Sequence, residues 1–364
     1  MGKNILMTVG PIPARLDSVK FVTNRFKGGL AVKTANMLAD LGHTVTLVAW
    51  KFAEIESNLP VIRIDDVMDY YNKVLAFEAD AYILAGAVAN LMPSSPYEGK
   101  FPSHNFHVGE KFNIEFEIAP RVIDDIKKRH PRSTLIGYKL YDGDDDELIQ
   151  AGKKTLFESK ANIVFANHPS WAKSKKFAIT QDGAVFECGF DEHVLLIDRV
   201  ISSEFYKTNI VEDSYALNLT EVWVKQTYPT YKADGRSYGC FAVRSGIGFI
   251  TTTRGKKNGR DAVTHIKSVD HLTRTITASP EKATLNAPLL DMCFRLNPTF
   301  TILLHGHKQI GRKVHDRYEF AGSDGDLNFA THMKSGEEVL LTNHGYLVGF
   351  ETLDEYLNYL KEQK

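Results

Sequence analysis

The feature that most constrains the fold is the alternation of short β-rich runs with helical stretches over about the first two hundred residues. The β-rich runs cover residues 4–9, 43–50, 81–88, 133–140 and 162–169. Between them, apolar residues recur at helical spacing, as Leu30, Met37 and Leu41 do. Strands that alternate with helices predict an α/β fold with a Rossmann-like, doubly wound parallel sheet. Ligands bind such sheets at the carboxyl ends of the strands.

The sequence changes in character near residue 202. Denser β signals appear at residues 239–253 and 300–307, mixed with helical stretches at residues 287–296 and 353–362. We therefore expect two domains, residues 1–204 and residues 205–364, a number that suits a chain of 364 residues. No low-complexity linker marks the boundary, and the sequence contains no internal repeat.

Composition argues against several classes of protein. The chain is 43% hydrophobic and 24% charged, with a formal net charge of -1, which is ordinary for a globular protein. No basic block favours nucleic acid, no apolar run could span a bilayer, and the first residues lack a signal-peptide pattern. Cys188, Cys240 and Cys293 are far apart and odd in number, which argues against disulfides and a cysteine-based zinc site. We expect a cytoplasmic protein without nucleic-acid or membrane partners.

A glycine-rich segment runs from the first predicted strand into the first predicted helix, and reads "GPIPARLDSVKFVTNRFKGGLA". Backbone N–H groups at such a turn suit a phosphate, although a plain structural turn uses the same residues. The whole segment resembles the phosphopantothenoylcysteine synthetase family, with its Gly-Pro turn, L-D-x-V-[RK]-[FY] run and T-N-x-x-x-G element in order. The resemblance continues through "GAVANL", "IAPRVIDDI" and "NIVFANHPS", and covers roughly residues 3–200.

This resemblance implies a ligase that activates a carboxylate as an acyl-nucleotide, using CTP or ATP with Mg2+, and then joins it to an amine. Asn24 falls on the family's active-site asparagine and Lys100 on the first lysine of its lysine-rich loop. The positions that the resemblance places in the nucleotide site are Gly10, Gly28, Gly86, Ala87, Asn90 and Asn167.

Three departures from the family pattern remove or change charges. The A-D-Y element reads Ala89, Asn90, Leu91, the lysine-rich loop has shrunk to "GKFPS", and the A-N-D element ends in His168. Because charge-assisted contacts are the stronger ones, these changes leave open a paralogue that uses a different carboxylate or amine. The acidic run at residues 142–147 could be a magnesium site, but acids in the first turn of a helix are usually solvated.

Two histidines stand one residue apart at the end of the apolar run "TILLHGH". Alternate side chains of a strand share a face, so His305 and His307 lie side by side, with Gly306 between them. The pair alone could be two solvated histidines. A third, His344, follows another apolar run, and three histidines suit Zn2+ or another divalent metal with an open position for substrate. The H-x-H and later N-H-G patterns resemble the class II aldolase/adducin family over roughly residues 210–360, which implies an α/β/α domain.

The catalytic residue of that family is missing. In family aldolases a glutamate nineteen residues before the first histidine moves the proton, and here that position is Asn286, which cannot titrate. The family's phosphate-contacting asparagine is Cys240. Glu281, Asp291 or His315 could replace the glutamate, and the sequence selects none of them. Adducin-like relatives that keep the fold without the chemistry supply the alternative.

The two resemblances together predict a bifunctional enzyme that acts on small-molecule substrates and a nucleotide. One domain would be a ligase and the other a metal-dependent domain of lyase type. Because both families form oligomers, we expect a homo-oligomer, either a dimer or a tetramer. Two alternatives remain open: a binding or regulatory protein built from two decayed enzyme domains, and a metal-dependent lyase or dehydratase to which the first half only presents a nucleotide-linked substrate.

Overall fold

The computed structural model describes residues 2–213, 215–233, 236–255 and 263–363. Its contacts divide the chain into two units. The first unit comprises Met1–Gln181 and Val185–Ser202, and the second comprises Asp182–Ala184 and Ser203–Lys364. No helix among the described residues is both long enough and apolar enough to cross a membrane.

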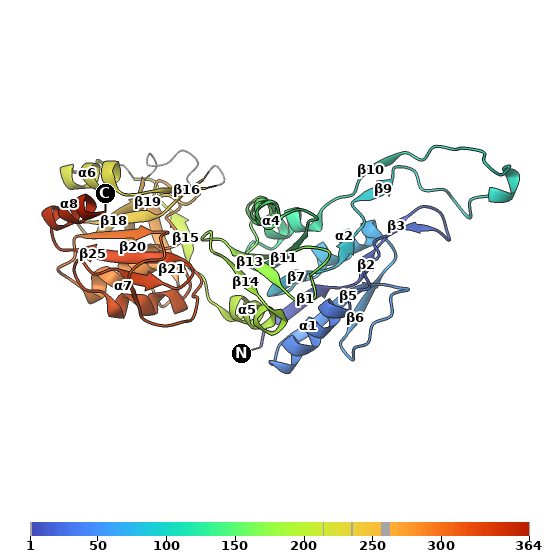
Figure 1. Ribbon diagram of the computed structural model, residues 1–364, viewed down its shortest axis with the longest axis horizontal. Coiled ribbons are helices and arrows are strands. Elements are labelled where there is room, and N and C mark those ends of the chain that lie inside the picture. The colour runs from blue at the N-terminus through green and yellow to red at the C-terminus, as the bar shows by residue number, and fades with distance from the viewer. Residues whose placement is uncertain (1, 214, 234–235, 256–262, 364) are drawn as a thin grey trace. The chain divides into compact units, whose positions relative to one another are not determined.

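The described part of the first unit forms an eight-stranded sheet in the order β14-β13-β12-β11-β7-β1-β5-β6 (Figure 1). The run from β12 to β6 is parallel, while β13 and β14 add an antiparallel edge. The strands are β1 (Asn4–Thr8), β5 (Thr44–Trp50), β6 (Val61–Ile64), β7 (Ala81–Leu84), β11 (Thr134–Leu140), β12 (Ile163–Asn167), β13 (Lys176–Thr180) and β14 (Val185–Cys188). The predicted parallel Rossmann-like sheet is confirmed.

Helices cover both faces of this sheet, which makes it doubly wound (Figure 1). Helices α2, α3 and α4 contact one another in sequence, and α1 contacts α5. The helices are α1 (Gly29–Asp40), α2 (Val67–Ala76), α3 (Val122–Arg129), α4 (Asp145–Ser159) and α5 (Phe190–Ser202). Shorter elements are β2 (Pro11–Ile12), β3 (Ala14–Arg15), β4 (Phe21–Val22), β8 (Ala87–Val88), β9 (Leu91–Pro93), β10 (Phe116–Ile118) and the 3-10 helix η1 (Ser103–Asn105). The acidic run starts α4, where the Asp144 side chain accepts a hydrogen bond from the backbone N–H of Glu147, as an N-cap does.

The second unit is built on a sheet of nine strands among its described residues, in the order β15-β21-β20-β19-β18-β22-β25-β24-β23. The strands are β15 (Lys207–Ile210), β18 (Cys240–Ser245), β19 (Gly248–Thr252), β20 (Val263–Asp270), β21 (Thr275–Ser279), β22 (Ile302–Gly306), β23 (Arg312–Lys313), β24 (Val339–Leu341) and β25 (Gly345–Phe350). A separate hairpin pairs β16 (Tyr231–Ala233) with β17 (Arg236–Tyr238). The sheet is mainly antiparallel, and only its two edge pairs run parallel.

Two apolar clusters cover the opposite faces of this second sheet. One contains Leu303 together with residues of α7 (Ala287–Leu296) and of the 3-10 helix η2 (Gly325–His332). The other contains Ile302 and Leu304 together with residues of α6 (Leu219–Thr227) and α8 (Leu353–Glu362). Because side chains alternate along a strand, every residue of β22 is buried. The unit is therefore an α/β/α sandwich, as expected.

Helix α5 buries a histidine against the first sheet. The ring of His193 is 1% exposed, and its Nε2 atom lies 2.6 Å from the Tyr138 hydroxyl. Burial, with the nearby Lys176 charge, lowers the pKa of His193 to about 3. The native state therefore keeps this ring neutral at pH values where the unfolded chain protonates it.

The first prediction concerns the dependence of stability on pH. A histidine whose folded pKa is lowered makes the free energy of unfolding fall by up to about 1.4 kcal/mol per pH unit as pH drops below about 6.5. In a His193→Gln variant, which removes the titrating group, we expect a smaller loss of stability between about pH 7 and about pH 5, measured by urea unfolding. A Tyr138→Phe control keeps the histidine and should keep the steeper dependence. Equal pH slopes in the wild type and His193→Gln would contradict the assignment.

Candidate functional site

The predicted glycine turn brings the end of β1 against the start of α1. Gly10 and Gly28 both have positive φ, 72° and 85°, a region that favours glycine. A Cβ added to Gly28 would lie 2.4 Å from the Gly10 nitrogen, so the two backbones are in direct contact. Gly28 is also the N-cap of α1. The turn therefore presents the amino end of a helix at the carboxyl end of a strand.

Three more of the sequence-predicted residues, Asn24, Gly86 and Ala87, lie beside this turn. The backbone N–H of Ala87 donates to the Gly10 carbonyl oxygen over 2.8 Å, and Ala87 follows Gly86 at the carboxyl end of β7. The Asn24 side-chain amide donates to the carbonyl oxygens of Ala87 and Val88, at 3.1 and 2.9 Å. Strands β1 and β7 flank the point where the strand order reverses, which is where open α/β sheets bind ligands.

These contacts show what the Asn24 side chain binds within the chain. The amide nitrogen donates to two adjacent backbone carbonyls of β8, so the side chain fixes this segment beside the glycine turn. A bond from the same amide to an acyl intermediate would require one of these two bonds to be exchanged.

A buried aspartate holds the segment that carries Lys100. The Asp17 carboxylate is 0% exposed and accepts hydrogen bonds from the backbone N–H groups of Val19, Lys20 and Phe101. The Lys20 ammonium, 2.8 Å from Asp17 Oδ2, holds the pKa of Asp17 well below its usual range, and the backbone donors add to this. Lys100 itself is exposed. The sequence pattern included Asp17 but did not indicate that it fastens this loop.

The remaining predicted positions lie on other segments. Asn90 is exposed, and its backbone carbonyl accepts from Ala119. Asn167 ends β12 and is buried, and its Oδ1 atom has no hydrogen-bond partner among the residues that the structure describes. His168, the departure next to it, lies 3.0 Å from an oxygen of Asp142. No described hydrogen bond joins the side chain of Asn90, Lys100 or Asn167 to the glycine turn.

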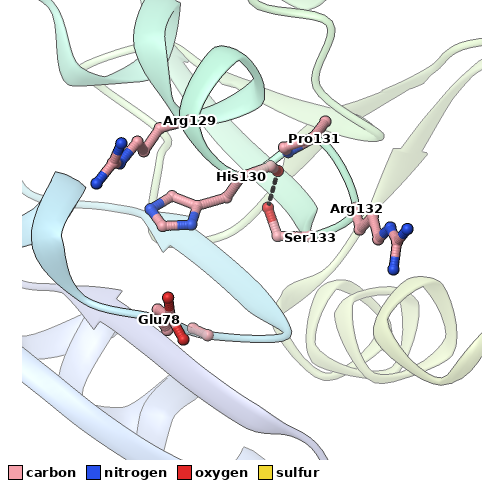
Figure 2. Close-up of a pocket in the computed structure, with 7 residues that line it drawn as sticks. Glu78, Arg129, His130, Pro131, Arg132 and Ser133 are labelled. Atoms are coloured by element: carbon pink, nitrogen blue, oxygen red, sulfur yellow. Dashed lines mark hydrogen bonds between the residues drawn. The ribbon is translucent and has the colours of Figure 1, made fainter.

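A cavity of about 340 Å³ lies at the end of the first sheet that is opposite the glycine turn. Its lining comes from residues 78–79, which precede β7, and residues 129–133, which precede β11. Figure 2 shows the side chains of Arg129 and Arg132 extending to opposite sides, so they do not converge on one ligand. The His130 ring is held by the Leu75 carbonyl at 2.9 Å. The cavity is therefore at the amino ends of the strands, whereas the glycine turn is at their carboxyl ends.

The second unit brings its three predicted histidines together. One ring nitrogen each from His305, His307 and His344 lies within 4.8 Å of the other two. His305 is the penultimate residue of β22 and is 1% exposed, and its Nδ1 atom lies 2.9 Å from the Tyr346 carbonyl oxygen. Because a carbonyl only accepts, Nδ1 carries the proton, and the lone pair of the neutral ring lies on Nε2.

Two glycines allow the histidine-bearing segments to approach. A Cβ on Gly345, whose φ is 140°, would lie 2.0 Å from the Gly306 carbonyl oxygen. A Cβ on Gly306 would lie 2.4 Å from a ring carbon of Tyr346. Substituting either glycine would therefore push the strand carrying His305 away from the segment carrying His344.

The chemistry of this cluster fits a divalent metal. His344 is 3% exposed, and neither of its ring nitrogens has a hydrogen-bond partner in the described part of the chain. A buried polar group without a partner is costly, and a metal ion would satisfy it. Burial lowers the pKa of His344, which favours the neutral form that binds metals. Three histidines around one position are the donor set of many zinc sites.

No described hydrogen bond or ion pair joins the Glu281 or Asp291 side chain to the three histidines. Asn286 stands at the N-cap position of α7 without a capping hydrogen bond from its side chain. It is 5% exposed, with its amide nitrogen 3.8 Å from Cys240 Sγ. Asp291 is paired with His271 and Arg295, and Glu281 is exposed.

Two buried carboxyl groups were missed by the sequence analysis. Asp182 Oδ2 lies 3.6 Å from His344 Nε2. Asp326 is 1% exposed, and burial, to which the Asp182 charge adds, raises its pKa well above the usual range. Nothing in the sequence near either residue signals a site.

Residues 1–189 match the family model described as the DNA/pantothenate metabolism flavoprotein C-terminal domain. This match covers more than half of the 364 residues. The chain belongs to this family. The resemblance inferred from the first half of the sequence is thereby confirmed.

The family includes curated relatives that are longer than the matched region. The coenzyme A biosynthesis bifunctional protein CoaBC of Thermococcus kodakarensis is 27% identical over 171 residues, which are 46% of this chain and 41% of that protein. The chain spans about two fifths of the length of the curated relatives that it matches first.

Solved structures show more distant similarity. The DNA/pantothenate metabolism flavoprotein from Streptococcus pneumoniae has a TM-score of 0.47 and 22% identity, over 54% of this chain and 96% of that one. An L-fuculose 1-phosphate aldolase has a TM-score of 0.28 and 15% identity, over 34% of this chain and 70% of that one. Similarity at this level does not bear on function.

Proposed function

We propose that the first unit is a nucleotide-dependent ligase of the phosphopantothenoylcysteine synthetase type. In this reaction a carboxylate oxygen attacks the α-phosphorus of CTP or ATP and pyrophosphate leaves. An amine then attacks the acyl carbon, and the nucleoside monophosphate leaves. The observation that carries the proposal is the family match over residues 1–189, joined by relatives whose name places them in coenzyme A biosynthesis.

The structure of the first unit supports roles for four of the predicted positions, which are Gly10, Gly28, Lys100 and Asn167. The amino end of α1, reached through Gly10 and Gly28, would face nucleotide phosphate, where the helix dipole and backbone N–H groups favour negative charge. Lys100 would add a cation as charge develops on the phosphate, and Mg2+ would accompany the nucleotide. The buried Oδ1 atom of Asn167 would accept a hydrogen bond from an amino group of the base, because it has no partner among the described residues.

The second prediction tests the ligase. We expect the wild type to release pyrophosphate from CTP or ATP with Mg2+ when 4′-phosphopantothenate, or another carboxylate from a broad panel, is supplied with cysteine or another amine. Lys100→Ala should lower the rate about tenfold or more, because a transition-state cation is lost. Lys111→Ala, at another exposed lysine of the same long loop, is the matched control and should leave the rate unchanged.

Absence of pyrophosphate release with every pair in the panel would contradict the ligase proposal. It would favour the alternative of a binding or regulatory protein for this unit.

We propose that the second unit holds Zn2+ or another divalent metal on His305, His307 and His344 and acts on a carbonyl substrate as a lyase. The observation that supports this is the convergence of the three rings, with both nitrogens of buried His344 lacking a partner in the described chain. A bound metal would polarise a carbonyl oxygen. Asn286 would then orient substrate through its amide, because it cannot move a proton.

The third prediction tests the metal. Protein purified without added metal should contain about one divalent ion per chain by elemental analysis, because three neutral histidines form a zinc-type donor set. A His305→Ala, His307→Ala double variant should lose it. His332→Ala replaces an exposed histidine of the same unit and should retain it. Wild-type protein that neither contains metal nor takes up added Zn2+ would rule out the site.

We also propose that the chain is a homo-oligomer, a dimer or a tetramer. The long loop between β9 and β10 extends away from the first sheet (Figure 1) and exposes several apolar side chains. Val108 is fully exposed and Phe112 is 54% exposed, and the Phe112 ring stacks on Phe101 at 4.8 Å. Contiguous exposed apolar surface of this kind usually marks an interface, and a second copy of the chain would cover it.

The fourth prediction tests this assembly. The mass from light scattering should correspond to at least a dimer, and a Val108→Ser, Phe112→Ser double variant should shift it toward the monomer because apolar contact area is lost. Leu272→Ser removes an exposed apolar side chain of the second unit and serves as control. A monomeric wild type at high concentration would contradict the proposal.

A further inference from the structure

The short turn Asp182–Ala184 belongs to the second unit and brings a carboxylate to the histidine cluster. Asp182 is 7% exposed. Its Oδ2 atom lies 3.6 Å from Nε2 of His344, the histidine whose nitrogens have no hydrogen-bond partner in the described residues. A buried charged group at this place is a costly feature unless it has a partner of opposite charge.

Contacts on both sides hold this turn in place. The Tyr318 hydroxyl donates to Asp182 Oδ2 over 2.6 Å, and the backbone N–H of Ala184 donates to Oδ1 over 3.2 Å. Gly183 has a φ of 90°, and a Cβ there would lie 2.4 Å from a ring carbon of Tyr238. The Tyr238 ring lies 5.2 Å from that of His307. The turn is thus fixed beside two of the three histidines.

The distance between Asp182 and His344 suits a shared metal better than a hydrogen bond. The carboxylate does not belong to the group of ligand atoms that lie within 4.8 Å of one another, so metal binding would draw it closer to the other two histidines. At 3.6 Å the two atoms are beyond hydrogen-bonding range. Two ligand atoms on one tetrahedral zinc ion, each about 2.0–2.2 Å from the metal, lie about 3.3–3.6 Å apart. Carboxylates that bind metals are usually hydrogen-bonded themselves, as Asp182 is by Tyr318.

We propose that Asp182 is a fourth protein ligand of the metal, giving a set of three histidines and one carboxylate. This inference rests on the metal site of the proposed function. The carboxylate lowers the charge of a buried divalent ion on three neutral rings. It also supplies an acidic group, from a different part of the chain, to a site where Asn286 stands in place of the glutamate of the class II aldolase/adducin family. Substrate would then bind by expansion of the coordination shell.

The fifth prediction uses Co2+ as a spectroscopic probe in the full-length protein, after its own metal has been removed with a chelator. We expect wild-type protein to bind one Co2+ per chain with a visible spectrum that reports four protein ligands. Asp182→Asn should change this spectrum and weaken Co2+ affinity by more than the roughly 10–100-fold that follows loss of an outer-shell partner. Tyr318→Phe removes a hydrogen bond from the same oxygen but keeps the carboxylate, so it should keep the wild-type spectrum.

A second variant separates the ligand role from a change of charge. Gly183→Val keeps Asp182 and all three histidines, but its side chain would collide with Tyr238 and displace the turn. It should reproduce the altered spectrum of Asp182→Asn, with circular dichroism used to verify folding. If Co2+ binds wild type and Asp182→Asn with the same affinity and spectrum, the inference is overturned and the three-histidine site stands. If wild-type protein takes up no Co2+, both are overturned.

Discussion

The pairing of β22 between β18 and β25 is the constraint on which the second unit's site depends. His305 lies opposite Cys240 on one neighbouring strand and Leu347 on the other, so backbone hydrogen bonds fix its height in the sheet. Helices on both faces bury the strand. The His305 imidazole therefore cannot rotate into solvent, and its hydrogen bond to the Tyr346 carbonyl fixes its orientation. The cost of holding polar rings in such surroundings is what a bound ion would relieve.

The site predicted in the first unit differs, because backbone groups rather than side chains form most of it. The main chains of Gly10 and Gly28 are in contact, and the side-chain amide of Asn24 donates hydrogen bonds to backbone carbonyls of β8. A surface made of N–H groups and a helix terminus recognises phosphate without a specific side chain.

Much of the fold could be predicted from the sequence, because hydrophobic periodicity and short-range turn chemistry are local properties. Alternating strands and helices predicted the parallel sheet, and the spacing of His305 and His307 predicted a shared face. Roles that depend on distant contacts could not be predicted. Asp17 binds the backbone of Phe101, Asp182 approaches His344, and Asp326 is buried, yet nothing in the residues around each of them in sequence indicates these surroundings. Only packing brings these carboxylates to their partners.

The close approach of Gly306 and Gly345 has a consequence for comparing related chains. A methyl group at Gly345 would overlap the Gly306 carbonyl oxygen. The spacing between the two histidine-bearing segments is therefore set by two residues that have no side chain. A homologue can keep all three histidines and still lose the geometry if either glycine is replaced. Inspection of these two positions is therefore a stricter criterion than counting histidines when deciding which relatives could retain the centre.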